Sequence, residues 1–312
     1  MEHSKINMAD RFKGALIGLA CGDAIGTTVE FSPRDSFTEV TGMHGGGPFS
    51  LKAGQWTDDT SMALCLAESL LTKDSCDPID QLNRYRNWYE WGYLSSTGEC
   101  FDIGHTVRDA IARFAHTGEP FCGSIAENTA GNGSIMRLAP VIMFSYPNHA
   151  DAMRNASISS RTTHGATEAI ECCQLLGDVL FHIFDGIEKD KLLHQLKFDP
   201  SMEKVKSIKR GDFQTKTRSQ IRGSGYCVDS LEAALWCFFT TESYSDAVLK
   251  AVNLGDDADT TAAVTGQIAG ANYGFGAIPI EWRSQISLRE DIEQMALALF
   301  HRSECKTTPA RK

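Results

Sequence analysis

The chain has 312 residues, of which 42% are hydrophobic and 22% charged, a balance typical of a globular protein rather than a disordered one. Forty acidic residues against thirty basic ones give a net charge of −10. This charge argues against a general nucleic-acid binder, because phosphate contacts need a basic surface.

The ten cysteines form no CxxC pair. We also find no signal-peptide-like apolar core near the start and no segment approaching the roughly 18 apolar residues of a membrane span. We therefore expect a reduced, cytoplasmic protein that does not contact a membrane.

Apolar residues spaced three and four apart predict helices along the whole chain. The predicted helical segments are residues 12–20, 62–70, 106–115, 166–184, 228–239, 244–252, 260–272 and 288–301. Alternation of β-branched residues, which would indicate strands, is nearly absent. These patterns predict an all-α fold. We expect a single compact domain over residues 9–303, with short flexible termini at residues 1–8 and 304–312.

Two kinds of connecting segment stand out. Glycine-rich loops at residues 42–48, 131–133 and 223–225 let a ligand approach the main chain closely. None is followed by the GK[ST] of a phosphate-binding P-loop, and none follows a strand as a dinucleotide fingerprint does. Residues 204–222 carry seven Lys or Arg against one acid, Asp212. We expect a solvated loop there, the alternative being a flank that attracts a pyrophosphate.

Two acidic clusters each precede a predicted helix: TDDT at residues 57–60 and DDADT at residues 256–260. Either one alone predicts a helix cap, because acids at a helix start interact favourably with its dipole. Together they suggest more. Oxygen-only clusters suit hard cations, Mg²⁺ or Mn²⁺ ahead of Ca²⁺, and the lack of His and Cys within them argues against zinc. If the clusters meet in space, Asp58, Asp59, Asp257 and Asp259 could hold two cations for assisted hydrolysis.

Four blocks of the chain resemble the ADP-ribosylglycohydrolase family, in the family's order. They are GALIGLACGDAIGTTVEF (residues 14–31), GQWTDDTSMAL (54–64), GNGSIMRLAP (131–140) and GDDADTTAAVTGQIAGANYG (255–274). The resemblance is closest to the dinitrogenase reductase-activating glycohydrolase type, which favours arginine-linked substrates, and it spans nearly the whole chain. It implies an all-helical domain with a dinuclear metal site at the base of a cleft.

The resemblance also implies roles for individual residues. Glu30 matches a glutamate near the metals, and the expected catalytic carboxylates are Glu30, Asp58 and Asp257. The expected metal ligands are Thr57, Asp58, Asp59, Asp257, Asp259 and Thr260. The residues expected to bind substrate are Asp102, Gly104, Asn132, Gly133, Ser134, Ile135, Met136, His164 and Tyr226.

Several of these expectations are specific about geometry. Residues 131–136 are expected to hold the diphosphate and distal ribose mainly through free backbone amides. Tyr226 is expected either to stack on adenine or to be only a half-buried residue at a helix start. Asp23 is expected to organise a helix end rather than touch substrate. Asp256, where relatives often have glycine, is expected to lie outside the site.

The implied activity is hydrolysis of the glycosidic bond at the anomeric carbon of protein-linked ADP-ribose, most simply arginine-linked, with two cations, Mg²⁺ or Mn²⁺, holding the ribose. The alternatives are a serine- or nucleic-acid-linked substrate, a non-catalytic ADP-ribose binder or crystallin-like structural member, and a phosphohydrolase that releases AMP. The expected partners are an ADP-ribosylated protein and ADP-ribose. Nucleic acid is expected only as a modified substrate, and the protein is expected to be a monomer.

Overall fold

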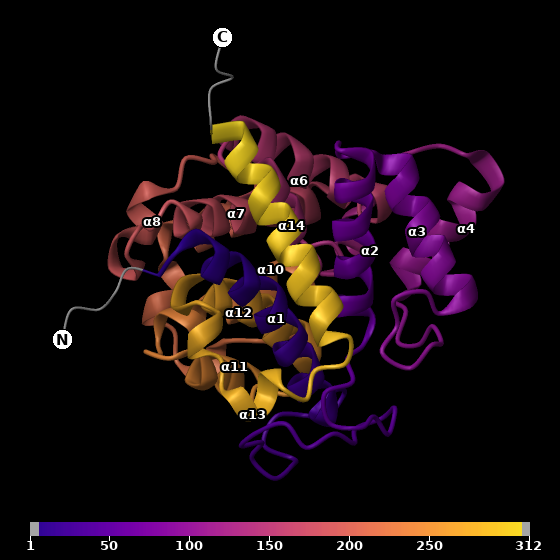
Figure 1. The fold of residues 1–312 in the computed structure, drawn as a ribbon. Helices are drawn as coiled ribbons and strands as arrows, with labels where there is room; N and C mark the ends of the chain where they lie inside the picture. Colours follow the sequence, from indigo (N-terminus) through magenta and orange to yellow (C-terminus); the bar gives the residue numbers. More distant parts are fainter. Residues whose placement is uncertain (1–5, 308–312) are drawn as a thin grey trace.

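The computed structural model describes residues 6–307, which form a body of helices joined by long loops (Figure 1). The α-helices are α1 (Met8–Gly26), α2 (Asp58–Lys73), α3 (Pro78–Trp91), α4 (His105–Thr117), α5 (Ala139–Ser145), α6 (His149–Thr163), α7 (Thr167–Phe184), α8 (Leu192–Gln195), α9 (Glu203–Arg210), α10 (Cys227–Phe239), α11 (Tyr244–Val252), α12 (Ala258–Tyr273), α13 (Ile280–Arg283) and α14 (Arg289–Thr307). No strand occurs between residues 6 and 307, where only three isolated bridges are found. The predicted all-α fold in one compact domain is confirmed.

Every predicted helical segment corresponds to an observed helix, but α3, α5, α6 and α9 and the four-residue helices α8 and α13 were not predicted. Helix α6 buries Ala, Asn, Ser and Thr rather than large apolar side chains, so its sequence lacks the usual apolar stripe. Helix α9 corrects the expected loop at residues 204–222. It is anchored by the buried side chains of Val205 and Ile208, and its basic groups pair with acids such as Asp212, whose Oδ2 lies 2.8 Å from Nη2 of Arg210.

The ends of the chain differ slightly from the predicted boundaries. Helix α1 begins at Met8 and α14 continues to Thr307, so the helical body extends past residues 9–303 on both sides. The outer parts of the two predicted flexible termini, residues 1–5 and 308–312, lie outside the described residues. No helix in the described part of the chain has the length and apolarity to cross a membrane.

Helices α1 and α12 pack antiparallel at the centre of the fold with their backbones in direct contact. A Cβ built on Gly14 would lie 2.1 Å from the carbonyl oxygen of Gly270, and one built on Gly22 would lie 2.1 Å from that of Ala262. No side chain fits at such positions. The glycines of α1 that meet α12 in this way recur every fourth residue: Gly14, Gly18, Gly22 and Gly26. The close contact places the C-terminal end of α1 beside the N-terminal end of α12.

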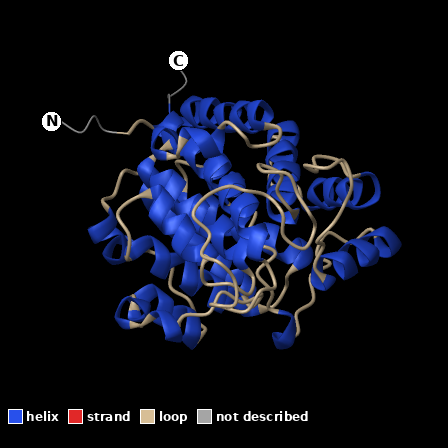
Figure 2. Cartoon of the chain, turned by 90° about the horizontal axis from the view of Figure 1, so that it is seen from below, coloured by secondary structure: helices blue, strands red, loops and turns tan. Residues whose placement is uncertain are grey.

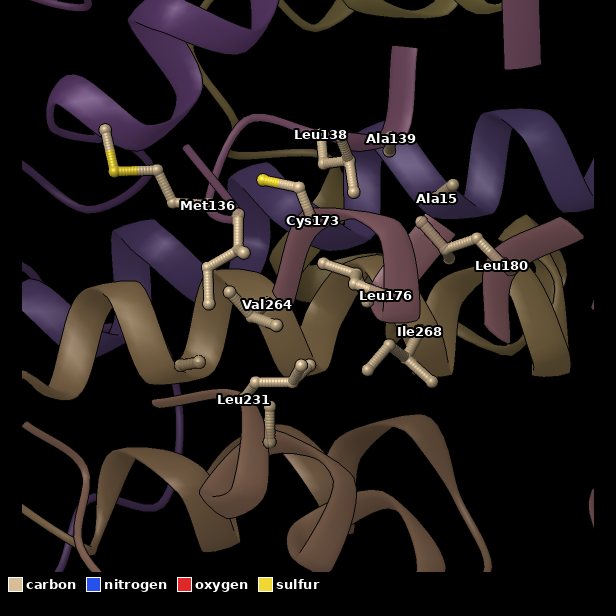
Figure 3. Close-up of a cluster of buried hydrophobic side chains, with 14 of the residues drawn as sticks. Ala15, Met136, Leu138, Ala139, Cys173, Leu176, Leu180, Leu231, Val264 and Ile268 are labelled. Carbon is tan, nitrogen blue, oxygen red and sulfur yellow. The ribbon is translucent and has the colours of Figure 1, made fainter. Parts of the chain in front are cut away.

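The hydrophobic core surrounds this central pair (Figure 3). Side chains from α7 and α10 reach α12 from two sides, and the segment that leads into α5 covers a third. All of the labelled side chains are at most 2% exposed. They are Ala15, Met136, Leu138, Ala139, Cys173, Leu176, Leu180, Leu231, Val264 and Ile268. Figure 2 shows the connecting loops gathered over one face of the helical body, and these loops carry much of the site described below.

The α1–α12 contact predicts an unusual response to a Gly→Ala substitution. Alanine ordinarily stabilises a helix by about 1 kcal/mol relative to glycine. At Gly270, however, the new Cβ would lie 1.9 Å from the carbonyl oxygen of Gly14, and we expect overpacking to reverse the sign and destabilise the protein by about 2 kcal/mol. Urea unfolding measures this change. Gly276→Ala is the matched control, because nothing lies within 4 Å of its added Cβ; equal stability of the two variants would refute the close contact.

Candidate functional site

A cleft of about 1000 Å³ opens where α1 ends and where α2 and α12 begin. Most of the residues predicted for the site line this cleft. Its wall combines carboxylates from four separate segments with the glycine loop at 131–133 and two histidines, His105 and His164. No Lys or Arg occurs among the described residues that line it. The predicted residues in its lining are Glu30, Asp58, Asp102, Gly104, Asn132, Gly133, Met136, His164, Asp257, Asp259 and Thr260. Thr57 and Asp59 are fully buried and lie against Asp259 and Thr260 respectively.

Asp23, from the end of α1, caps the start of α2. Its Oδ1 accepts from the backbone N–H and hydroxyl of Thr57, at 2.8 and 2.9 Å, and its Oδ2 accepts from the backbone N–H and hydroxyl of Thr60, at 3.0 and 2.6 Å. Helix α2 begins at Asp58 after Thr57, as predicted, but the side chain of Thr57 makes no capping bond. The cap is therefore supplied by another helix. With four hydrogen bonds accepted, Asp23 has no lone pair left for a ligand.

Asp59 and Asp259 meet beneath the cleft with unused oxygen atoms. They are 0% and 1% exposed, and the Thr57 hydroxyl lies 3.2 Å from an Oδ2 of each. The Oδ1 atoms of both residues are buried without a hydrogen-bond partner. A buried carboxylate oxygen that lacks a partner is costly, so these two atoms indicate a ligand.

The carboxylates form two overlapping groups whose oxygen atoms lie within 4.8 Å of one another. One consists of Asp23, Asp59 and Asp259, of which Asp59 and Asp259 keep an oxygen free for a ligand, and the other of Glu30, Asp102 and Asp259. Asp259 belongs to both. Carboxylate and hydroxyl oxygens are the donors that hard divalent cations prefer, so the residues present fit divalent-cation binding.

Burial and mutual repulsion disfavour the charged forms of these acids. Desolvation is the largest cause at every one, and the charge of Asp102 is the next for Glu30 and Asp58. The pKa of Glu30 is raised to about 10 and that of Asp102 to about 7. The pKa values of Asp58, Asp59 and Asp259 are raised well above the usual value for an aspartate. Bound cations would offset this repulsion.

The loop 131–136 differs in part from the expectation of free amides. The amides of Ile135 and Met136 both donate to the carbonyl oxygen of Asn132, at 3.0 and 3.2 Å. They are therefore occupied, and this part of the expectation was wrong. The amides of Gly133 and Ser134 make no hydrogen bond to the described residues and stay available.

The same loop is tied to α12 and to the start of α10. The side-chain amide of Asn132 donates to Oδ2 of Asp257, at 2.7 Å, and its backbone N–H donates to the carbonyl oxygen of Gly225, at 3.0 Å. Ser134 and Ile135 are buried and do not line the cleft. The Ser134 hydroxyl instead bonds that of Ser160, at 3.0 Å.

Tyr226 lies outside the cleft, in an adjoining pocket of about 530 Å³. The two cavities share Thr106, Gly131 and Gly225 in their walls. The tyrosine is half-buried at the start of α10, and its hydroxyl donates to Glu168. The ammonium of Lys204 donates to the same hydroxyl, at 2.9 Å, and lies 4.9 Å from the ring centroid.

Asp256 and Asp102 both have left-handed backbone angles, with φ of 57° and 61°. Such angles favour glycine, and aspartate is among the few other residues that adopt them. Asp256 pairs through its main chain with residues 31 and 32, at 2.8 Å for both bonds. Its side chain lies at the cleft edge but in neither carboxylate group.

A third group with metal-ligand residue types, His149, Asp178 and His182, lies away from the cleft. Asp178 is 0% exposed and uses Oδ2 to accept from the backbone N–H groups of Lys197 and Phe198. Nδ1 of His182 is 2.8 Å from the carbonyl oxygen of Asp178, so it acts as a donor and not as a ligand. The group ties the 197–198 turn to α7.

The raised pKa values predict how pH affects the cation-free protein. Carboxyl groups titrate near 4 when unfolded, whereas the pKa of Glu30 is about 10 and that of Asp102 about 7 in the fold. The folded state therefore binds more protons across this window, and its stability falls as pH rises. We expect the melting temperature in EDTA to decrease between about pH 5 and pH 9. A saturating divalent cation should flatten the slope; a melting temperature independent of pH in EDTA would contradict the prediction.

Comparisons with known proteins agree with this geometry. The sequence model of the family described as ADP-ribosylglycohydrolase matches residues 4–308. The chain is 44% identical to "ADP-ribosylarginine hydrolase Tri1" of Pseudomonas putida, with 94% of this chain and 79% of that protein covered. It is 33% identical to "ADP-ribosyl-[dinitrogen reductase] glycohydrolase" of Rhodospirillum rubrum, with 91% and 92% covered. A solved structure, "ADP-ribosylglycohydrolase-related protein complex", superposes with a TM-score of 0.85 at 44% identity, over 95% of this chain and 99% of that one. The chain belongs to the ADP-ribosylglycohydrolase family.

Proposed function

We propose that this chain hydrolyses the bond between ADP-ribose and an arginine side chain of a modified protein. The observation that carries the proposal is the pair of carboxylate groups sharing Asp259 at the floor of a cleft of about 1000 Å³. Relatives that are 44% and 33% identical over at least 91% of this chain are named as an ADP-ribosylarginine hydrolase and an ADP-ribosyl-[dinitrogen reductase] glycohydrolase. The first name supports the arginine linkage, and the second supports a modified protein as the substrate.

The proposed cofactors are two divalent cations, Mg²⁺ or Mn²⁺. The candidate ligands are Thr57, Asp58, Asp59, Asp257, Asp259 and Thr260. All of these donors are oxygen atoms, which favours hard cations over zinc. When bound, the cations would hold the ribose hydroxyls and stabilise charge that develops on the sugar.

Glu30 is the proposed residue that orients the attacking water. Its carboxyl group is 5% exposed and receives a hydrogen bond from the Thr27 hydroxyl, at 3.3 Å. It lines the cleft and lies in the same carboxylate group as Asp102 and Asp259. The glutamate is therefore held in place at the cleft while one edge stays available for water. Asp58 and Asp257 complete the proposed catalytic carboxylates, and together these acids can hold a proton between attack and product release.

The proposed path of the ADP-ribose runs from the carboxylates past the loop 131–134 to the pocket of Tyr226. The free amide of Gly133, which lines the cleft, would donate to the diphosphate. The adjoining pocket of about 530 Å³, which Tyr226 lines, has room for the adenosine, and the tyrosine ring could stack on the base. Continuity of the two cavities through Gly131 and Gly225 supports this placement.

The acceptor arginine would leave across the other side of the cleft, beside an aromatic edge. Phe31 is 65% exposed with φ of 61°, and its ring meets Phe49 in a T-shaped contact with centroids 6.4 Å apart. Phe49 in turn contacts Phe101 at 5.2 Å. An exposed aromatic ring next to carboxylates suits a guanidinium cation, which binds ring faces.

The remaining alternatives are less well supported. A binder or structural member has no need of unpartnered carboxylate oxygens beneath the cleft. A phosphohydrolase would be expected to release AMP. We also propose that the protein acts on ADP-ribosylated protein as a monomer in the cytoplasm; the ten free cysteines support a reducing compartment.

The first test is the activity itself. The protein incubated with an ADP-ribosylarginine peptide and Mg²⁺ or Mn²⁺ should release intact ADP-ribose, identified by mass, and not AMP. Asp259→Asn should reduce kcat by on the order of 10³-fold, because it removes a charge from both carboxylate groups. Asp256→Asn, which removes a neighbouring charge outside both groups, is the matched control. Full activity of Asp259→Asn, or release of AMP, would overturn the proposal.

The exposed ring of Phe31 predicts that its removal weakens binding of the arginine acceptor and leaves binding of ADP-ribose unchanged. Phe31→Ala should raise KM for an arginine-linked peptide about threefold, the effect expected for an exposed cation–π contact. Affinity for free ADP-ribose, which has no guanidinium, should stay unchanged when measured by calorimetry. Phe31→Tyr keeps the ring and should behave as the unmodified protein. An equal loss of affinity for ADP-ribose and peptide would show that Phe31 does not act on the acceptor.

A further inference from the structure

Arg137 is a fully buried cation without an acidic partner. It is 0% exposed, and no carboxylate in the described part of the chain forms an ion pair with it. Its guanidinium stacks on the ring of Tyr85, with Cζ 4.6 Å from the centroid. Burying an unpaired charge costs free energy, so the guanidinium must be stabilised by other contacts.

The guanidinium donates both to the glycine loop and to the end of α6. Nη1 donates to the carbonyl oxygen of Gly133, at 3.0 Å. Nη2 donates to Oγ1 of Thr163, at 2.7 Å, and to the carbonyl oxygen of Ser159, at 3.2 Å. Because a guanidinium only donates, Thr163 must accept from it. The hydroxyl proton of Thr163 is left to be donated elsewhere.

The neighbour available to accept that proton is His164. Oγ1 of Thr163 and Nδ1 of His164 lie 2.9 Å apart, and Thr163 Oγ1 has no third partner among the described residues. If Nδ1 carried a proton, the buried Thr163 hydroxyl proton would have no acceptor, at a cost of about 1–3 kcal/mol. With Nδ1 as the acceptor, the Thr163 hydroxyl accepts from Arg137 and donates to His164, so its hydrogen-bonding capacity is used.

We propose that Arg137 and Thr163 are positioning residues that hold His164 as a neutral imidazole with its proton on Nε2, and that this N–H donates to an oxygen atom of the ligand in the cleft. The chain of donors runs from Arg137 through Thr163 to His164. Only the identity of the ligand, ADP-ribose, rests on the function proposed above.

The imidazole presents its Nε2 edge at the glycine loop. A Cβ on Gly131 would lie 3.2 Å from Nε2, and one on Gly133 would lie 2.8 Å from Cε1. These two glycines and His164 line the cleft together. The close approach of the ring, rather than a left-handed backbone, therefore explains why glycine stands at both positions.

The charge of Arg137 also keeps His164 neutral. Burial, followed by the repulsion from Arg137, lowers the pKa of His164 to about 3. The ring thus stays uncharged throughout the neutral range, and its single proton has a fixed place. A neutral donor of fixed direction adds no charge to a cleft that already holds several carboxylates.

Nitrogen-15 NMR of the histidine rings tests the tautomer without any ligand. The His164 signals, identified by their loss in His164→Gln, should show a protonated Nε2 and an unprotonated Nδ1, unchanged between about pH 5 and pH 8. Thr163→Val, which keeps the shape but loses the hydroxyl, should give a mixture of tautomers, and Thr163→Ser should restore the single form. A protonated Nδ1 in the unmodified protein, or one unchanged tautomer in Thr163→Val, would overturn the proposal.

Calorimetry with ADP-ribose tests the ligand contact separately. The amide nitrogen of His164→Gln can replace the Nε2 donor, whereas that of His164→Asn lies near the position of Nδ1. We expect His164→Asn to weaken ADP-ribose binding about tenfold more than His164→Gln, the effect of one hydrogen bond to a charged oxygen. Equal losses would overturn the contact while leaving the tautomer established by NMR. A failure to hydrolyse arginine-linked ADP-ribose would affect neither result.

Discussion

The direct backbone contact between α1 and α12 is the constraint on which the site depends. Glycines at four-residue intervals remove every side chain from the face of α1 that meets α12, so the helices approach more closely than ordinary ridges and grooves allow. Because the helices are antiparallel, the end of α1 and the start of α12 share one edge. Asp23 then extends this edge to α2 by capping it. Three helix ends are fixed relative to one another before any ligand is considered.

The same arrangement creates the main energetic problem of the fold. Asp23, Asp59 and Asp259 are at most 1% exposed, and close carboxylates repel in a low-dielectric interior. Hydrogen bonds from Thr57 and Thr60 satisfy Asp23 fully, but Asp59 and Asp259 each keep one bare oxygen. The protein thus tolerates an unsatisfied cluster in a rigid frame, which is how functional sites commonly depart from the rules that stabilise the rest of a fold.

Much of this was accessible from the sequence. Apolar periodicity predicted eight helices because they bury large side chains, whereas α6 was missed because it packs through Ala, Ser and Thr. The two acidic clusters were recognised as one site, since oxygen donors repeat at two helix starts. Asp23 was expected to organise a helix end, but which helix it caps could not be predicted, because that required knowing that α1 ends beside α2. The occupied amides of Ile135 and Met136 could not be predicted either, because backbone pairing within an irregular turn leaves no residue pattern. The unusual position of Arg137 was visible as a residue pattern, because it is the single charge within the apolar run SIMRLAPVIM.

Asp259 belongs to both carboxylate groups, and this sharing bears on how two cations would load. Two ions that both drew on Asp259 would not bind independently: the first would weaken the oxygens that the second needs, yet would also relieve the repulsion among the remaining acids. The affinities of the two positions are then linked, and each reports on the occupancy of the other. Filling of the site would follow a cooperative or anticooperative isotherm, with a half-loaded state whose chemistry differs from that of the full one.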